Sequence, residues 1–388
     1  MINVLFDFPN NPGWIAGLHY FLNLFHAIKS LPGRRINPII LGPPENLPLS
    51  LRANTFIPRY SPPIPTLKSI RYVRNLLEYR FIGHSGDYDR YLQRHKIDLL
   101  SHMAFPSGHT NVPVLAWIPD FQHRHLPQYF SQKEIDDRCY RHAQIAEKAQ
   151  GILLSSENAR SDFNRFHPGF ENKTHILRFV SALCGVSEHP AEEIVYKKYD
   201  IKEPYFHVPN QLWAHKNHSV ILDALSILRK CGHCPLVIST GNIEDRRNID
   251  YFPKLLQRVK DTGMEERFRF LGLIEYGEVY VLMRGAIALI NPSLFEGWST
   301  MVEEGKSLGK RLFLSSIAVH QEQANERTSF FEPSNSERLA SLMDDTLKSY
   351  DLCDEKAAMV TAAYELPNRI RQYGLNYENI VFNILGHQ

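Results

Sequence analysis

Short apolar runs alternate with segments of helical spacing throughout the first half of the chain. Residues 19–31 and 135–149 repeat apolar side chains every three or four positions, which predicts two amphipathic helices. Buried strands are predicted at 2–8, 36–42, 97–103, 112–118 and 151–156. Because strands alternate with helices, the pattern predicts a parallel sheet with helices on both faces.

The same alternation restarts in the second half of the chain. Helices are predicted at 219–230 and 251–263. Strands are predicted at 205–210, 235–240, 267–272, 286–293 and 311–316. Residues 181–203 mix glycine, proline and charged residues with weak periodicity, which makes them the candidate linker.

We therefore expect an N-terminal domain over residues 1–185 and a C-terminal domain over residues 186–365. A final helix over residues 366–388 should pack back toward the first domain. A length of 388 residues suits two domains with full cores. Two α/β domains joined by a linker predict a cleft between the carboxyl ends of their sheets, where ligands of such folds bind.

Composition and charge exclude several classes of protein. The chain has 44 basic and 42 acidic residues, so a net charge of +2 does not favour binding to nucleic acid. No apolar run approaches the roughly 18–20 residues that span a bilayer, and the N-terminus lacks the features of a signal peptide. Five cysteines, an odd number, argue against a disulfide framework. We expect a cytoplasmic protein.

The most informative chemistry lies where a predicted strand, a short loop and a helix start follow one another. Glu296 lies in the loop, and Glu304 lies eight positions further on in the helix. Ser299 or Thr300 can cap this helix, and its first amides can bind phosphate oxygens. Two carboxylates around an anion site suit a ligand with a central diphosphate and hydroxyl-rich groups at both ends, such as a nucleotide sugar. By spacing alone, two solvated glutamates beside a helix explain the pattern as well.

Two further loops carry candidate ligand contacts. Gly13 and Gly17 lie between the first strand and the first helix, where they would let the backbone approach a phosphate closely. A plain turn also explains them, since the G-x-G-x-x-G pattern is absent. Lys216 follows the first strand of the second half, where its ammonium would lie near a bound anion. A solvated lysine is the alternative reading.

Together these segments resemble one family of enzymes. The stretch NPSLFEGWSTMVEEGKSLGKRLFLSS is similar to the signature of glycosyltransferase family 4, whose members are retaining enzymes with the GT-B fold. PNQLWAHKNH, WIPDFQHRHLPQYF and SSENARSDF match further segments in order, so the resemblance covers nearly the whole chain. It implies an α/β protein of two Rossmann-like domains, whose parallel sheets face an interdomain cleft.

The resemblance also implies an activity and roles for residues. A sugar would move from a nucleotide-diphosphate donor to a glycan or lipid-linked hydroxyl acceptor, with retention of configuration and without a metal or other cofactor. Glu296 would position the sugar, Lys216 would meet the charge of the leaving diphosphate, and Asp120 and His123 would serve the acceptor side. The implied donor contacts are Gly13, Gly17, Gln211, His215, Gly297, Trp298, Ser299, Thr300 and Glu304. Glu304 would bind the ribose hydroxyls.

Two positions depart from the family pattern. Many members carry an arginine about five residues before the phosphate lysine, where this chain has the uncharged Gln211. Pro119 replaces the histidine that usually precedes Asp120, so that role would be empty or would pass to Asp120 or His123. These departures leave open a GT-B binding protein without catalysis. A sugar-nucleotide epimerase on the same fold is a third reading.

Other features are weaker. Residues 67–81 are basic and amphipathic, so they suit either peripheral contact with the inner face of a membrane or an ordinary surface helix. Cys231 and Cys234 have the spacing of a metal or redox pair, but we expect no metal site because a second pair is lacking. The sequence does not identify the sugar, the base or the acceptor.

Overall fold

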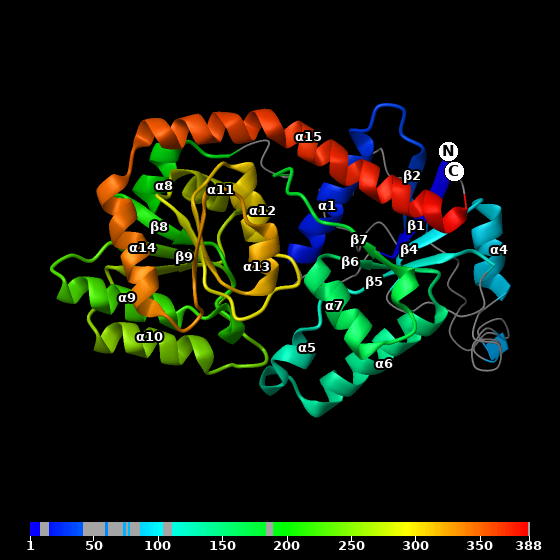
Figure 1. Ribbon diagram of the computed structural model, residues 1–388, viewed down its shortest axis with the longest axis horizontal. Helices are drawn as coiled ribbons and strands as arrows, with labels where there is room; N and C mark the ends of the chain where they lie inside the picture. Colours follow the sequence, from blue (N-terminus) through cyan, green and yellow to red (C-terminus); the bar gives the residue numbers. More distant parts are fainter. Residues whose placement is uncertain are drawn as a thin grey trace. The chain divides into compact units, whose positions relative to one another are not determined.

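The computed structural model describes residues 1–7, 15–41, 59–60, 73–74, 77, 86–103, 111–183 and 189–386 (Figure 1). The chain forms two compact units. The first unit consists of Met1–Phe121, Ser131–Phe179 and Arg369–Gln388, and the second consists of Gln122–Phe130 and Val180–Asn368.

Two segments cross the simple division of the chain into halves. Gln122–Phe130 belongs to the second unit, although the predicted N-terminal domain over residues 1–185 included it. Helix α15 (Leu352–Leu385) begins in the second unit and contributes its last turns to the first. The sequence prediction placed the final helix with the first domain, but it did not foresee the exchange of Gln122–Phe130, because local periodicity does not report which unit a segment packs against.

The first unit is built on a seven-stranded sheet in which every described strand pairing is parallel. The strand order is β3-β2-β1-β4-β5-β6-β7. The strands are β1 (Ile2–Asp7), β2 (Ile36–Leu41), β3 (Arg59–Tyr60), β4 (Leu99–Met103), β5 (Val114–Trp117), β6 (Gly151–Leu154) and β7 (Thr174–Ile176). The five strands predicted in this half are confirmed, and β3 and β7 were missed.

Helices cover both faces of this sheet. They are α1 (Ile15–Lys29), α4 (Gly86–Arg94), α6 (Gln132–Lys148) and α7 (Glu157–Phe166), with the end of α15. Leu5 of β1 packs in a core with Ile145 of α6 and Phe163 of α7. The next residue, Phe6, points to the other face and meets Phe25 of α1 with ring centroids 5.0 Å apart. Alternate residues of one strand therefore fill two separate cores.

The second unit is built on a six-stranded parallel sheet, with helices around it (Figure 1). The strand order is β10-β9-β8-β11-β12-β13. The strands are β8 (Tyr205–Val208), β9 (Leu236–Thr240), β10 (Phe268–Gly272), β11 (Leu289–Asn291), β12 (Leu312–Ser315) and β13 (Thr328–Phe331). The five predicted strands are confirmed, and β13 was missed.

The same alternation fills two cores in the second unit. Phe206 and Phe313 lie in one cluster with Leu225 of α9, whereas Tyr205 and Leu312 lie in the other. The helices are α8 (Glu192–Lys198), α9 (Ser219–Lys230), α10 (Tyr251–Asp261), α11 (Tyr276–Gly285), α12 (Thr300–Ser307), α13 (Ala318–Gln323) and α14 (Ser336–Ser349). The predicted architecture of two parallel α/β sheets is confirmed.

The strand order fixes where a ligand can bind in the second unit. The chain runs outward from β8 through β9 to β10, and then outward in the other direction from β11 through β12 to β13. The order therefore reverses between β8 and β11. In open parallel sheets, ligands bind beyond the carboxyl ends of the strands at such a reversal.

The segment predicted to contact a membrane lies almost entirely outside the residues that the structure describes. Within residues 67–81 the structure describes Val73, Arg74 and Leu77. No helix in the described part of the chain combines the length and apolar character needed to cross a membrane.

Candidate functional site

Three loops leave the carboxyl ends of β9, β8 and β11, which are neighbours in the second sheet. The β8 loop leads into a short 3-10 helix, η4 (Ala214–Lys216), and the β11 loop leads into α12. Gln211 Oε1 accepts a hydrogen bond of 2.6 Å from the Asn242 amide, which ties the β8 loop to the β9 loop. The Leu294 amide donates to the His215 carbonyl at 2.8 Å, which ties the β8 loop to the β11 loop. The three loops therefore form one connected structure.

Gly241, directly after β9, permits the close approach of two of these loops. Its φ of +144° lies where other residues are strained. A Cβ atom at this position would lie 2.4 Å from the carbonyl oxygen of Asn210. Any larger residue would therefore displace the β8 loop.

Lys216 and Glu296 form an ion pair between η4 and the β11 loop. Lys216 Nζ lies 2.5 Å from Glu296 Oε1, and both side chains are largely buried. The Ser293 hydroxyl donates to the same oxygen at 2.7 Å. Burial alone would raise the pKa of Glu296, but the nearby charge of Lys216 outweighs it and holds the pKa at about 2. Glu296 is therefore ionised at neutral pH.

Three buried histidines near this pair are neutral at pH 7. Burial lowers the pKa of His215 and of His218 to about 3, and the pKa of His320 to about 4. The charge of Lys216 contributes to the lowering in each case. His215, a predicted donor contact, can thus offer a hydrogen bond but no positive charge. Gln211 also offers no charge, and its oxygen already accepts the Asn242 amide.

The start of α12 differs from the prediction. Ser299 occupies the N-cap position, but its side chain makes no capping hydrogen bond. Its hydroxyl instead accepts a hydrogen bond of 2.9 Å from the Asn291 side chain. The Ser299 amide, which was expected to be free for a phosphate, donates to Gln323 Oε1 at 2.9 Å in this structure. The amides of Thr300, Met301 and Val302 are the first-turn donors that lack an intrahelical acceptor by helix geometry.

Glu304 lies one turn into α12 and is buried. Its Oε1 accepts a hydrogen bond of 2.6 Å from the hydroxyl of Tyr276, the first residue of α11. Gly297 and Trp298 fill the loop between Glu296 and α12 and are half-buried. The structure therefore holds one carboxylate before the helix start and the other inside the helix, within a single unit.

The N-terminal candidates do not all lie in one unit. Asp120 belongs to the first unit, where it lies 3.3 Å from the Arg138 guanidinium. His123 is 1% exposed and belongs to the second unit. Gly17 is a buried residue of α1, and Gly13 lies outside the described residues.

The segment Gln122–Phe130 brings further side chains to the second unit. It contains α5 (Gln122–His125) and the 3-10 helix η2 (Pro127–Tyr129). His125 stacks on Phe295, the residue before Glu296, with ring centroids 5.1 Å apart. Sequence reasoning assigned no role to Phe295, Asn291, Ser293, Tyr276 or Gln323. The first three lie in the stretch that resembles the family signature, but their contacts depend on other elements of the fold.

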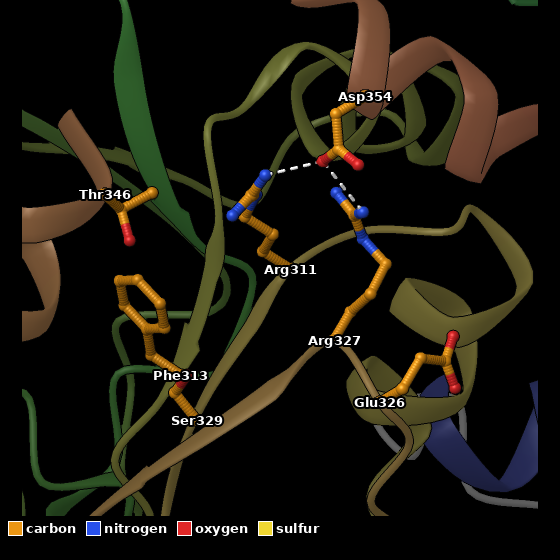
Figure 2. A pocket seen from close by; sticks show the side chains of 7 residues that line it. All are labelled: Arg311, Phe313, Glu326, Arg327, Ser329, Thr346 and Asp354. Carbon is orange, nitrogen blue, oxygen red and sulfur yellow. Dashed lines mark hydrogen bonds and ion pairs between the residues drawn. The ribbon is translucent and has the colours of Figure 1, made fainter. Parts of the chain in front are cut away.

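A separate cavity lies at the opposite ends of the strands. It has a volume of about 350 Å³ and is lined by Arg311, Phe313, Glu326, Arg327, Ser329, Thr346 and Asp354 (Figure 2). Figure 2 shows two arginines converging on Asp354, at 2.6 Å from Arg311 and 3.0 Å from Arg327. Both arginines immediately precede strands, β12 and β13, so the cavity lies at the amino ends of the sheet.

The charges beside this cavity anchor α15. Glu355, in the first turn of that helix, pairs with Arg327 at 2.5 Å and with the buried Lys310. The turn at Gly309 has a φ of +68°, and a Cβ atom there would lie 2.5 Å from the Ala358 carbonyl oxygen of α15. These groups attach a helix to the sheet, so we assign them a structural role.

No group of three or more potential metal-ligating side chains occurs among the residues that the structure describes. The Cys231 and Cys234 thiols are both free, and burial raises the pKa of Cys234. The Cys234 thiol packs against the Met264 sulfur at 3.7 Å. This environment is that of a packed apolar side chain.

Comparison with known proteins identifies the fold and one domain. Residues 192–366 match the family model described as Glycosyl transferases group 1, so the chain carries a domain of that kind in its second unit. The O-antigen chain mannosyltransferase RfbU of Salmonella typhimurium is 27% identical over 139 residues. That match covers 34% of this chain and 35% of RfbU, about a third of the curated relative.

Solved structures match over nearly the whole chain. Anabaena Alr3699/HepE in complex with UDP has a TM-score of 0.70 at 15% identity, covering 99% of this chain and 100% of that one. A glycosyltransferase from Rickettsia africae has a TM-score of 0.68 at 16% identity, covering 100% and 99%. At these identities the likeness concerns the fold, and it confirms the predicted GT-B architecture.

Proposed function

We propose that this protein is a retaining glycosyltransferase of the family 4 type, which moves a sugar from a nucleoside-diphosphate donor to a hydroxyl acceptor. The observation that carries the proposal is the grouping of Lys216, Glu296 and Glu304 at the carboxyl ends of neighbouring strands in one unit. A cation, two carboxylates and a helix start complement a diphosphate between two hydroxyl-rich groups. The group 1 domain that contains all three residues supports the same reading.

In this proposal each end of the donor has its own carboxylate. Glu304, held by the Tyr276 hydroxyl, accepts hydrogen bonds from the ribose hydroxyls. Glu296 accepts hydrogen bonds from the hydroxyls of the transferred sugar. The diphosphate lies between them, near Lys216 and the first-turn amides of α12, with the side-chain amide of Gln211 as a further hydrogen-bond donor.

The reaction breaks the bond between the anomeric carbon and the phosphate oxygen and forms a bond from that carbon to the acceptor oxygen. The acceptor attacks from the face that the diphosphate leaves, and its hydroxyl proton passes to a phosphate oxygen. Lys216 stabilises the negative charge that develops on the leaving diphosphate. Glu296, ionised and paired with Lys216, orients the sugar and does not attack it.

We further propose that these side chains and amides make a metal ion unnecessary. The acceptor side would be served by Asp120 or His123. A glycan or lipid-linked acceptor is proposed because RfbU, the curated relative, is an O-antigen chain mannosyltransferase. Peripheral membrane contact through residues 67–81 belongs to the same proposal.

Release of free nucleotide from a panel of UDP-, GDP- and TDP-sugars, with and without glycan acceptors, tests the function. Glu304→Ala should raise the donor KM at least tenfold, because the ribose loses a charged acceptor. Glu296→Ala should mainly lower kcat, because the sugar is no longer oriented. Full activity in both variants would contradict the site. Donor conversion without any acceptor would favour an epimerase, and binding without turnover would favour a non-catalytic GT-B protein.

A further inference from the structure

Arg247, in the β9 loop, lies beside η4 and was not predicted from the sequence. The buried carboxylate of Asp245 connects Arg247 to η4. Its Oδ1 accepts the Arg247 amide at 3.0 Å, and its Oδ2 accepts the amide of Ala214, the first residue of η4, at 3.0 Å. The Trp213 indole also donates to the Glu244 carbonyl at 3.0 Å. The backbone of Arg247 is therefore fixed next to the loop that carries Lys216.

The guanidinium of Arg247 contacts the segment that the second unit receives from the first half of the chain. It lies 4.2 Å from the centre of the Phe130 ring. Its Nη1 lies 3.5 Å from the side-chain oxygen of Gln122. A guanidinium can stack on an aromatic face, and its planar geometry matches that of a phosphate or carboxylate acceptor.

The positive charge of Arg247 affects the pKa of a residue in the candidate site. Burial lowers the pKa of His215, and the positive charges of Lys216 and Arg247 lower it further. His215 lies between Ala214 and Lys216 in η4, so Arg247 acts electrostatically on the loop proposed to hold the diphosphate. Lys216 shares its charge with Glu296, so a bound diphosphate gains from a second cation nearby.

We infer that Arg247 is a second cationic contact for the donor diphosphate, and that Phe130 and Gln122 hold its guanidinium in position. The inference rests on the proposed function and deepens it. It assigns the Gln122–Phe130 segment a role in binding the donor. It also explains how a site with the uncharged Gln211 binds a doubly phosphorylated ligand.

Calorimetric titration with UDP, GDP and TDP, and with the corresponding monophosphates, tests the inference. Arg247→Ala should weaken binding of the preferred diphosphate about tenfold or more, and binding of its monophosphate less, because one charged phosphate contact is lost. Arg247→Lys should retain part of the affinity. Arg246→Ala is the matched control, because Arg246 is the adjacent arginine, is exposed as Arg247 is, and its removal changes the net charge equally. This control should bind both ligands like the native protein.

Two results would overturn the inference while leaving the proposed function intact. One is an Arg247→Ala variant that binds the diphosphate within about twofold of the native protein. The other is an equal loss for diphosphate and monophosphate, which would indicate a purely structural role. If the native protein neither binds any of these nucleotides nor releases them from donors, the proposed function fails, and the inference fails with it. Thermal unfolding of each variant shows whether the variant is folded. Partial affinity in the Arg247→Lys variant distinguishes loss of the charged contact from loss of the fold.

Discussion

The buried ion pair of Lys216 and Glu296 predicts a specific pattern of stabilities. Glu296→Gln leaves the Lys216 ammonium buried without its counter-charge, and Lys216→Met does the same to the Glu296 carboxylate. Removing one partner of a buried pair destabilises a protein by about 3–5 kcal/mol, whereas replacing both partners is much milder. We therefore expect the double variant to be more stable than the two single effects added together would allow.

The structure sets the size of this effect. Lowering the pKa of Glu296 from 4.5 to about 2 corresponds to about 3 kcal/mol of preference for the ionised form in the folded protein. The double-mutant cycle should therefore give a coupling free energy of about 2–3 kcal/mol. Lys133 and Asp137, an ion pair of 2.8 Å with side chains 85% and 58% exposed, are the matched control. Because solvent screens that pair, the same cycle there should show a much smaller coupling.

The pH dependence has a definite sign. The pKa of Glu296 is lower in the folded protein than in the unfolded chain, so its contribution is complete above about pH 4.5 and is lost as the pH falls toward 2. Between pH 6.5 and 3.5 the native protein should lose roughly 1–2 kcal/mol more unfolding free energy than Glu296→Gln.

Urea unfolding at several pH values, followed by circular dichroism and tryptophan fluorescence, measures both quantities. The variants Glu296→Gln, Lys216→Met and their combination complete the cycle. Additive effects within about 0.5 kcal/mol would refute the reasoning. Parallel pH profiles of the native protein and Glu296→Gln would refute it independently.

Three further predictions concern the same region. Gln323→Leu removes the hydrogen bonds to both backbone groups of Ser299, so the free energy of unfolding should fall by about 2 kcal/mol in urea. Gln321→Leu, an exposed residue of the same helix, should cost clearly less, and equal losses would contradict the role of Gln323. Tyr276→Phe removes the hydrogen bond that orients Glu304, so steady-state assays should show a donor KM raised severalfold at unchanged kcat. A lowered kcat at constant KM would contradict that reading. Dialysis against EDTA should leave sugar transfer within about twofold, because Lys216 stabilises the leaving group. A loss restored by Mn²⁺ or Mg²⁺ would refute the metal-independent proposal.

The architecture could be predicted because each strand alternates between two cores. Tyr205 and Phe206 are adjacent in β8, yet they pack on opposite faces of the sheet. Such doubly covered strands are continuous apolar runs bounded by polar residues, and these runs are visible without any partner. β7 (Thr174–Ile176) escaped detection because its three residues are only half-buried. β13 (Thr328–Phe331) is also half-buried over most of its length.

The types of the residues at the candidate site could be predicted from the sequence, but the contacts between their side chains could not. Lys310 lies in the stretch that resembles the family signature, and its structural partner is Glu355 in the first turn of α15. Ser299 carries the expected hydroxyl at the expected position, yet its amide is taken by Gln323 from the following helix. In each case the partner lies on another element, and sequence spacing does not report it.

The sequence by itself determined the two parallel α/β sheets and the residue types of the candidate site. It placed Glu296 before a helix start, Glu304 inside that helix and Lys216 after the first strand of the second sheet, because these positions follow from local periodicity. The tertiary structure alone decided that Lys216 meets Glu296 and that Arg247 rests on Phe130. The physical reason is that such contacts depend on strand order and on loop packing between distant segments, and a local pattern of apolar and polar residues encodes neither.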